Sequence, residues 1–179
     1  MAFANNIFWY AVRVTYCREM IFKKHLDALN IENFIPMQYT LVEKGGKKRK
    51  KLVPVIHNLI FIKVTRGVLD GIKQKVENET PIRYIIDKAV NRPVTVPDKQ
   101  MENFINVSKH YDEQIVYLDI STLKKGDKVR ITGGPFSGIE GEFLRVKGDR
   151  RVVVNLENIM AVATAFIHPS LIEILHEQK

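Results

Sequence analysis

Residues 125–143 read Lys-Gly-Asp-Lys-Val-Arg-Ile-Thr-Gly-Gly-Pro-Phe-Ser-Gly-Ile-Glu-Gly-Glu-Phe, and this stretch decides the fold of the C-terminal part of the chain. Residues 129–132 alternate apolar and polar side chains, as a strand with one buried face does. The Gly-Gly and Ser-Gly pairs that follow mark turns. Further short strands are predicted at 143–146, 152–156 and 160–166. Several short strands leave open sheet edges unless they close, so we predict an SH3-like β-barrel over residues 122–179.

Upstream of residue 110, strand patterns alternate with helix patterns. Aromatic and β-branched residues at 7–14 predict a strand, and Phe22, Leu26 and Leu29 stack on one face of a helix predicted over 18–29. The remaining predicted elements are strands at 33–43 and 52–56 joined by a charged Gly-Gly hairpin loop, a strand at 59–65, a helix at 67–76, a strand at 82–86 and a helix that starts at Pro97-Asp98. The order β-α-β-β-α-β-α predicts an α+β fold in which helices flank an N-terminal antiparallel sheet of the split βαβ type.

Composition limits the classes of protein that this chain can belong to. It has 179 residues, a net charge of +8, a pI near 9.5 and 45% hydrophobic residues, which excludes a wholly disordered chain. A single cysteine, Cys17, cannot form an intramolecular disulfide, and the N-terminus has no secretory signal pattern, so we expect a cytoplasmic protein. The most apolar stretch, 52–64, falls short of the ~20 residues that cross a bilayer, so we expect no membrane association.

The positive charge is confined to one part of the chain. Residues 1–110 hold 19 Lys and Arg against 10 Asp and Glu, a net +9, whereas residues 111–179 hold 9 against 10, a net −1. The composition also changes after Tyr111, where the last helix pattern gives way to the strand-rich remainder. We therefore predict a domain at 1–110, a linker at 111–121 and the barrel at 122–179.

Six cations crowd together in the predicted hairpin loop. They are Lys44, Lys47, Lys48, Arg49, Lys50 and Lys51. Like charges this close repel one another, and a nearby phosphate backbone would relieve the repulsion and release counterions. Because the same domain has a net charge of +9, we favour nucleic-acid binding without base specificity over a solvated hairpin tip that has no partner.

The stretch at 125–143 has the Gly-Asp-x-Val start, the Gly-Pro-Phe-x-Gly turn and the later glycine of a KOW motif. Together with Trp9-Tyr10, Arg18-Glu19, the basic Gly-Gly hairpin and the sequence His-Asn-Leu-Ile-Phe-Ile at 57–62, it resembles the NusG family of transcription elongation factors, which combine NGN and KOW domains. The resemblance covers nearly the whole chain.

Within that family the chain is more similar to specialised paralogues than to housekeeping NusG. Pro36-Met37 and the pattern Asn58-x-x-Phe61 resemble RfaH-type antiterminators and the regulators of capsular polysaccharide operons. Housekeeping members usually have Pro-Gly-Tyr where this chain has His-Asn-Leu. The resemblance therefore implies an operon-specific antiterminator.

The resemblance implies that the N-terminal domain binds the clamp helices of the RNA polymerase β′ subunit and restrains upstream or non-template DNA, which suppresses pausing or termination. The barrel would recruit a second partner, which in relatives is ribosomal protein S10 or Rho, and its near-neutral charge agrees with a protein partner. The residues implied for the polymerase contact are Tyr10, Ile56, Leu59, Phe61 and Tyr84. Because side chains alternate along a strand, some of these must belong to the core.

One of the next four residues is a helical histidine, for which the alternative is an ordinary surface position. The resemblance implies that all four contact the exposed non-template strand. They are Arg13, Arg18, His25 and Asn78. Tyr16 either stacks on a flipped-out base or caps a core. The partner-binding residues implied for the barrel are Phe136, Leu156, Asn158, Ile159 and Met160. Phe136 lies at a predicted turn tip, where it either packs over the barrel end or anchors a partner.

Two other classes of protein fit the sequence less well. KOW barrels also occur in ribosomal proteins, so the alternative is a ribosome-associated RNA-binding protein, which would require positive charge on the barrel itself. An enzyme is disfavoured because the five histidines are scattered and no P-loop, nucleophile motif or metal-ligand spacing is present. We expect no catalysis, no cofactor and no bound metal.

Overall fold

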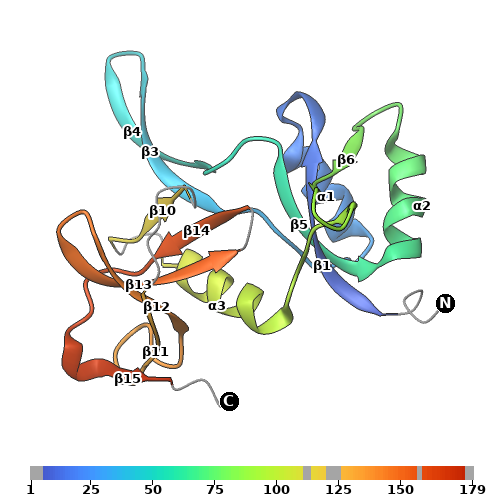
Figure 1. Ribbon diagram of the computed structural model, residues 1–179. Helices are drawn as coiled ribbons and strands as arrows, with labels where there is room; N and C mark the ends of the chain where they lie inside the picture. The colour runs from blue at the N-terminus through green and yellow to red at the C-terminus, as the bar shows by residue number, and fades with distance from the viewer. Residues whose placement is uncertain (1–5, 111–113, 120–125, 157–158, 176–179) are drawn as a thin grey trace. The chain divides into compact units, whose positions relative to one another are not determined.

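The chain forms two compact units. The computed structural model describes residues 6–110, 114–119, 126–156 and 159–175 (Figure 1). Contacts divide the chain into Met1–Asp98 and Lys99–Lys179, and each unit has its own antiparallel sheet. The α+β class predicted from the sequence is confirmed: an antiparallel sheet with helices, followed by a small β domain.

The sheet of the N-terminal unit has the order β2-β5-β1-β6, and β9 also pairs with β1. All these pairs are antiparallel, and the order is that of a split βαβ fold. The elements are β1 (Ile7–Val14), η1 (Thr15–Cys17), α1 (Glu19–Ala28), β2 (Asn33–Phe34), β5 (Leu59–Thr65), α2 (Arg66–Val76), β6 (Ile82–Tyr84) and β9 (Thr95–Val96). The predicted strand at 82–86 is split, because Ile86–Asp87 forms β7, which pairs with β8 (Arg92–Pro93).

One face of this sheet carries the core. Every second residue of β1 from Tyr10 to Val14 is buried against α1 and α2. Phe22 and Leu26 of α1 are fully buried in the same cluster, as their spacing predicted. Leu29 was predicted on that face but is half exposed, because α1 ends at Ala28.

The chain between β2 and β5 forms a separate two-stranded ribbon, which Figure 1 shows as a long hairpin. It consists of β3 (Met37–Lys44) and β4 (Lys47–Pro54), paired along their whole length. The prediction of a long charged loop is therefore wrong, because all six basic residues lie in strands β3 and β4. Only Gly45 and Gly46 form the turn, both with positive φ, as a two-residue hairpin connection requires.

The second unit is a six-stranded antiparallel sheet in the order β10-β14-β13-β12-β11-β15, together with most of one helix. Its elements are α3 (Asp98–Ser108), β10 (Val116–Leu118), β11 (Asp127–Ile131), β12 (Glu140–Val146), β13 (Asp149–Leu156), β14 (Met160–Ala163), η3 (Pro169–Leu171) and β15 (Ile172–Ile174). The helix begins at Asp98, as predicted. The strand predicted at 160–166 ends earlier, at Ala163.

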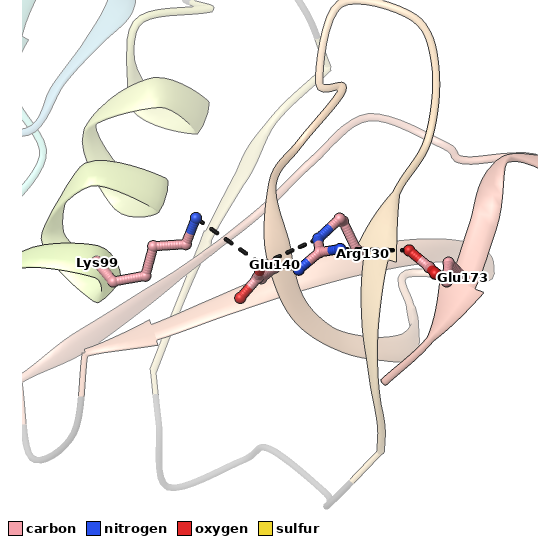
Figure 2. A network of polar contacts seen from close by, with 4 residues as sticks. All are labelled: Lys99, Arg130, Glu140 and Glu173. Carbon is pink, nitrogen blue, oxygen red and sulfur yellow. Dashed lines mark hydrogen bonds and ion pairs between the residues drawn. The ribbon is translucent and has the colours of Figure 1, made fainter. Parts of the chain in front are cut away.

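Arg130 holds three strands of this unit in register. It lies opposite Glu140 on β12 and opposite Glu173 on β15, and its guanidinium contacts both carboxylates, at 2.8 and 3.5 Å (Figure 2). The hydrogen bond to Glu140 raises the pKa of Arg130. Lys99 of α3 reaches the same Glu140 oxygen at 3.8 Å. Such exposed pairs add little stability, so we assign them mainly to register and to the docking of α3 on its own unit.

Part of the predicted linker is a strand. Residues 116–118 form β10, which pairs with β14, so the structure differs here from the linker predicted at 111–121. The reason is local, because Ile-Val-Tyr-Leu is itself an apolar strand pattern. The predicted limits of the domains stay predictions.

Replacing Gly141 by alanine should destabilise the second unit. A β-carbon there would meet the carbonyl oxygen of Val153 and would lie 2.9 Å from Val152 Cγ1, both on the adjacent strand β13. Such overpacking costs about 1–3 kcal/mol. In the matched variant Gly71→Ala the β-carbon meets nothing within 4 Å, and a helical alanine should be neutral or stabilising by up to ~1 kcal/mol. Urea unfolding followed by circular dichroism measures both, and equal midpoints would contradict this packing.

Candidate nucleic-acid interface

The β3–β4 ribbon sorts its six cations onto two faces. Directly opposite residues of an antiparallel pair lie on the same face, and the register places Lys44 opposite Lys47. The face that contains this pair, called the cationic face below, carries Lys44, Lys47, Arg49 and Lys51. The remaining two cations lie on the other face, Lys48 opposite Glu43 and Lys50 opposite Leu41.

All six cations are exposed. Within the described part of the chain, the structure records no ion pair for any of them. On the cationic face, where no acidic residue lies opposite, the mutual repulsion is therefore not relieved by the ribbon itself, and an external polyanion would relieve it. The ribbon has the geometry and charge to bind a phosphate backbone, but it offers no arrangement specific to a base.

The end of β1 brings together several of the other predicted nucleic-acid contacts. Arg18 donates a hydrogen bond to the carbonyl oxygen of Glu79, which places it beside the turn that contains Asn78, and its guanidinium lies 5.7 Å from the Tyr16 ring. Tyr16 is 77% exposed, so it does not cap a core. His25 lies on α1, also exposed, with its ring stacked 6.4 Å from that of Phe22.

Backbone strain presents Tyr16 to solvent. Tyr16 and Cys17 both have positive φ, 60° and 51°, which non-glycine residues rarely adopt. The Cys17 amide donates to the Asn58 side chain at 2.7 Å, and this bond helps to hold the strained turn. Strain of this kind often marks functional sites, but the sequence gives no local signal for it.

Arg13 has a neighbour that the sequence did not reveal. It lies directly opposite Arg83 on β6, and both side chains are exposed. A cross-strand pair of like charges is unfavourable unless an anion is near. Only the register of β1 with β6 brings these two arginines together, so no pattern within either segment could have predicted it.

The residues predicted to contact the polymerase divide between the two faces of the sheet. Tyr10 and Tyr84 belong to the helix-covered core. Leu59 and Phe61 lie opposite Arg13 and Ala11, on the other face, and both are buried in the structure. Ile56 is half-buried in the segment between β4 and β5. The structure therefore brings Leu59 and Phe61 together on the face opposite the helices, and Tyr10 and Tyr84 together on the helix-covered face.

Tyr84 is held by a charged network on α2. Its hydroxyl donates to Asp70, which also accepts a bond from Arg66 at 2.9 Å, and the Arg66 guanidinium lies 4.4 Å from the Tyr84 ring. Burial and the bond to Asp70 raise the pKa of Tyr84. Burial alone would raise the pKa of Asp70, but the bonds from Tyr84 and Arg66 outweigh it and lower that pKa. These contacts anchor Tyr84 to α2, and its binding to the polymerase stays a prediction.

In the second unit, Phe136 is buried, and its ring lies 4.7 Å from that of His110. Phe136 was predicted either to pack within the domain or to anchor a partner, and in this structure it packs. Leu156 and Met160 are buried and Ile159 is half-buried. Asn158 lies outside the described residues. Partner binding by these residues stays a prediction.

Within the described residues, no group of three or more His, Cys, Asp or Glu side chains could hold a metal ion. None of the helices described here combines the length and apolarity that crossing a membrane requires.

The chain matches the family model described as NusG, transcription termination factor nusG, over residues 8–105. It is 26% identical over 155 residues to the transcription elongation factor Spt5 of Acidianus ambivalens, covering 83% of this chain and 81% of Spt5. It also resembles a solved structure on domain interaction in Thermotoga maritima NusG, with a TM-score of 0.46, 20% identity and coverage of 96% of this chain and 98% of that one. The MjSpt4:Spt5 complex in conformation B aligns with a TM-score of 0.28 and 18% identity, covering 96% of this chain and 99% of the solved chain.

The family model and the Spt5 relative place this split βαβ domain with its cationic ribbon, followed by a small β domain, among transcription factors of the NusG and Spt5 kind. Because the family model covers more than half of the chain, the chain belongs to the NusG family. The family resemblance inferred from the sequence is confirmed at this level.

Replacing Asp70 by asparagine should lower the thermal midpoint near neutral pH. A carboxylate whose pKa is lower in the folded state stabilises the fold above its unfolded pKa of about 3.9, and this contribution is lost as the pH falls through the folded pKa. The gap between wild type and Asp70→Asn should therefore be widest above about pH 5 and close at lower pH. Tyr84→Phe, which keeps the ring beside Arg66, tests the hydroxyl alone. A gap that does not change with pH would contradict the network.

Proposed function

We propose that this chain is an RNA polymerase-binding elongation factor that acts as an operon-specific antiterminator of the RfaH type, with polysaccharide biosynthesis operons as candidate targets. The observation that carries the proposal is the cationic face of the β3–β4 ribbon in a member of the NusG family. The ribbon restrains upstream or non-template DNA while the N-terminal unit holds the polymerase, and the complex resists pausing and termination. Its place of action is the cytoplasm.

The spacing of the cationic face supports contact with a DNA backbone. Residues two apart in a strand are separated by about 6.8 Å. Phosphates of one DNA strand rise by ~3.4 Å each along the helix axis and also wind around it, so a row of same-face cations on β4 offers closely spaced charges to a phosphate backbone that passes along the ribbon. Lys47, Arg49 and Lys51 follow this spacing, and Lys44 lies across from the first of them.

The polymerase contact is assigned to the sheet face opposite the helices. Leu59 and Phe61 share that face with Trp9, which gives it an apolar surface suited to the β′ clamp helices. Tyr10 and Tyr84 lie on the opposite face of the sheet, in the helix-covered core, and are not part of this proposed contact with the polymerase. Because Leu59 and Phe61 are buried in the structure, polymerase binding requires that this face become accessible.

The second unit is assigned as a KOW domain that tethers another protein, with ribosomal protein S10 and Rho as the candidates. The net charge of −1 over residues 111–179 favours a protein partner. The same charge disfavours the alternative of a ribosome-associated RNA-binding protein, which would need cations on that unit.

The two faces of the ribbon provide a matched test of DNA binding. Arg49→Gln/Lys51→Gln removes two charges from the cationic face, and Lys48→Gln/Lys50→Gln removes two from the other face. Affinity for a labelled DNA duplex, measured across a NaCl series, should show a salt slope reduced by roughly 1.8 in the first variant and by much less in the second. Equal reductions would mean that the ribbon binds without a preferred face, and unchanged slopes would remove the ribbon from DNA binding.

Deletion of the gene tests operon specificity. An operon-specific antiterminator should lower promoter-distal RNA in one or a few long operons while leaving the promoter-proximal RNA of those operons unchanged. Strand-resolved RNA sequencing of wild-type and deleted cells measures this. Restoration by the wild-type gene but not by Arg49→Gln/Lys51→Gln would link the effect to the cationic face. A change spread over most transcripts would instead indicate a housekeeping elongation factor.

A further inference from the structure

One edge of the second sheet is filled by a short strand from the predicted linker. β10 lies at the end of the strand order and pairs with β14, with Val116 opposite Ala163 and Leu118 opposite Ala161. Without β10, β14 would be the last strand on this side of the described sheet. The N–H and C=O groups along that edge would then be a template for another extended chain.

The side chains at this edge are complementary in size. Ala161 and Ala163 are fully buried and belong to a small core cluster with Val146 and Val153. Val116 and Leu118, which are half-buried, pack against the same cluster from β10. The small alanines on β14 therefore leave space that is filled by two large apolar side chains, two residues apart, on the neighbouring strand.

Arg151 adds a recognition element for the backbone of the incoming strand. Its side chain is 5% exposed, and Nη1 donates to the carbonyl oxygen of Gln114 and, at 2.8 Å, to that of Thr164. A buried guanidinium requires acceptors, and the segment just before β10 supplies one of them. Every peptide has a carbonyl that could take the place of the Gln114 carbonyl.

We propose that the edge of β14 is a strand-binding site, occupied in cis by β10, that accepts in trans an extended segment of a partner protein with apolar side chains at positions i and i+2. β10 itself shows the chemistry that the edge selects. β10 has only three residues, each half-buried, so a longer segment could pair with more of the edge than β10 does. The occupant is a polypeptide, because the edge is lined by alanines and residues 111–179 have a net charge of −1.

The test uses the full chain with Val116→Ala/Leu118→Ala, which removes the large side chains of β10 but leaves β14 intact. The probe is a fluorescein-labelled peptide, Gln-Ile-Val-Tyr-Leu-Asp, which copies residues 114–119. A tethered strand competes at an effective concentration of about millimolar. The peptide should therefore bind the variant at least about tenfold more tightly than it binds wild type, as measured by fluorescence anisotropy.

Two matched controls define specificity. Tyr39→Ala/Leu41→Ala shortens two large side chains on the ribbon and should bind the peptide as wild type does. A peptide with aspartate in place of its valine and leucine should not bind. Hydrogen exchange gives a second readout: amides of residues 161–163 should lose protection in Val116→Ala/Leu118→Ala and regain it with peptide.

Equal affinity for wild type and the β10 variant, equal binding of the aspartate peptide, or unchanged protection at 161–163 would each overturn the proposal. If circular dichroism shows that the double variant is unfolded, Val116→Ala alone replaces it under the same criteria. Because these measurements read neither DNA binding nor polymerase binding, a negative result would leave those two parts of the proposed function in place.

Discussion

Pairing of β1 with β5 is the constraint on which the N-terminal unit depends. β1 lies between β5 on one side and β6 and β9 on the other, so its alternating side chains must serve two faces. Tyr10, Val12 and Val14 pack under α1 and α2, whereas Trp9 and Ala11 lie on the opposite face. A slip of one residue would exchange these faces. The separation of the core from the proposed polymerase surface follows from this register.

The same alternation of side chains along a strand sorts the cations of the ribbon onto two faces. A two-stranded ribbon alone is marginally stable, and here one of its faces concentrates four cations with no acidic partner among the described residues. This arrangement opposes stability and favours an anionic partner. In the second unit, alternation along β10 directs two apolar side chains to the alanines of β14. Both proposed binding functions therefore arise from which side chains share a strand face.

Elements with a strong local pattern were predictable from the sequence. The strand Ile7–Val14 and the start of α3 at Asp98 agree with prediction, because alternation and a Pro-Asp start are local signals. The basic part of the ribbon was predicted as a loop because lysines disfavour strands, and only pairing with β3 makes residues 47–51 of β4 extended. The division of four of the predicted polymerase contacts between two faces, and the juxtaposition of Arg13 with Arg83, depend on register between distant segments. Sequence spacing carries no information about such register.

Binding of RNA polymerase is the property on which both the DNA-restraining role of the ribbon and the proposed antitermination depend. The most direct test is affinity capture of the tagged full chain from its own cell extract, treated with nuclease, with quantification of polymerase subunits and ribosomal proteins by mass spectrometry. The account predicts that β′ is recovered after nuclease treatment, which would exclude a link through nucleic acid alone. Recovery of ribosomal proteins without polymerase would contradict it and would make the cationic face a contact to ribosomal RNA.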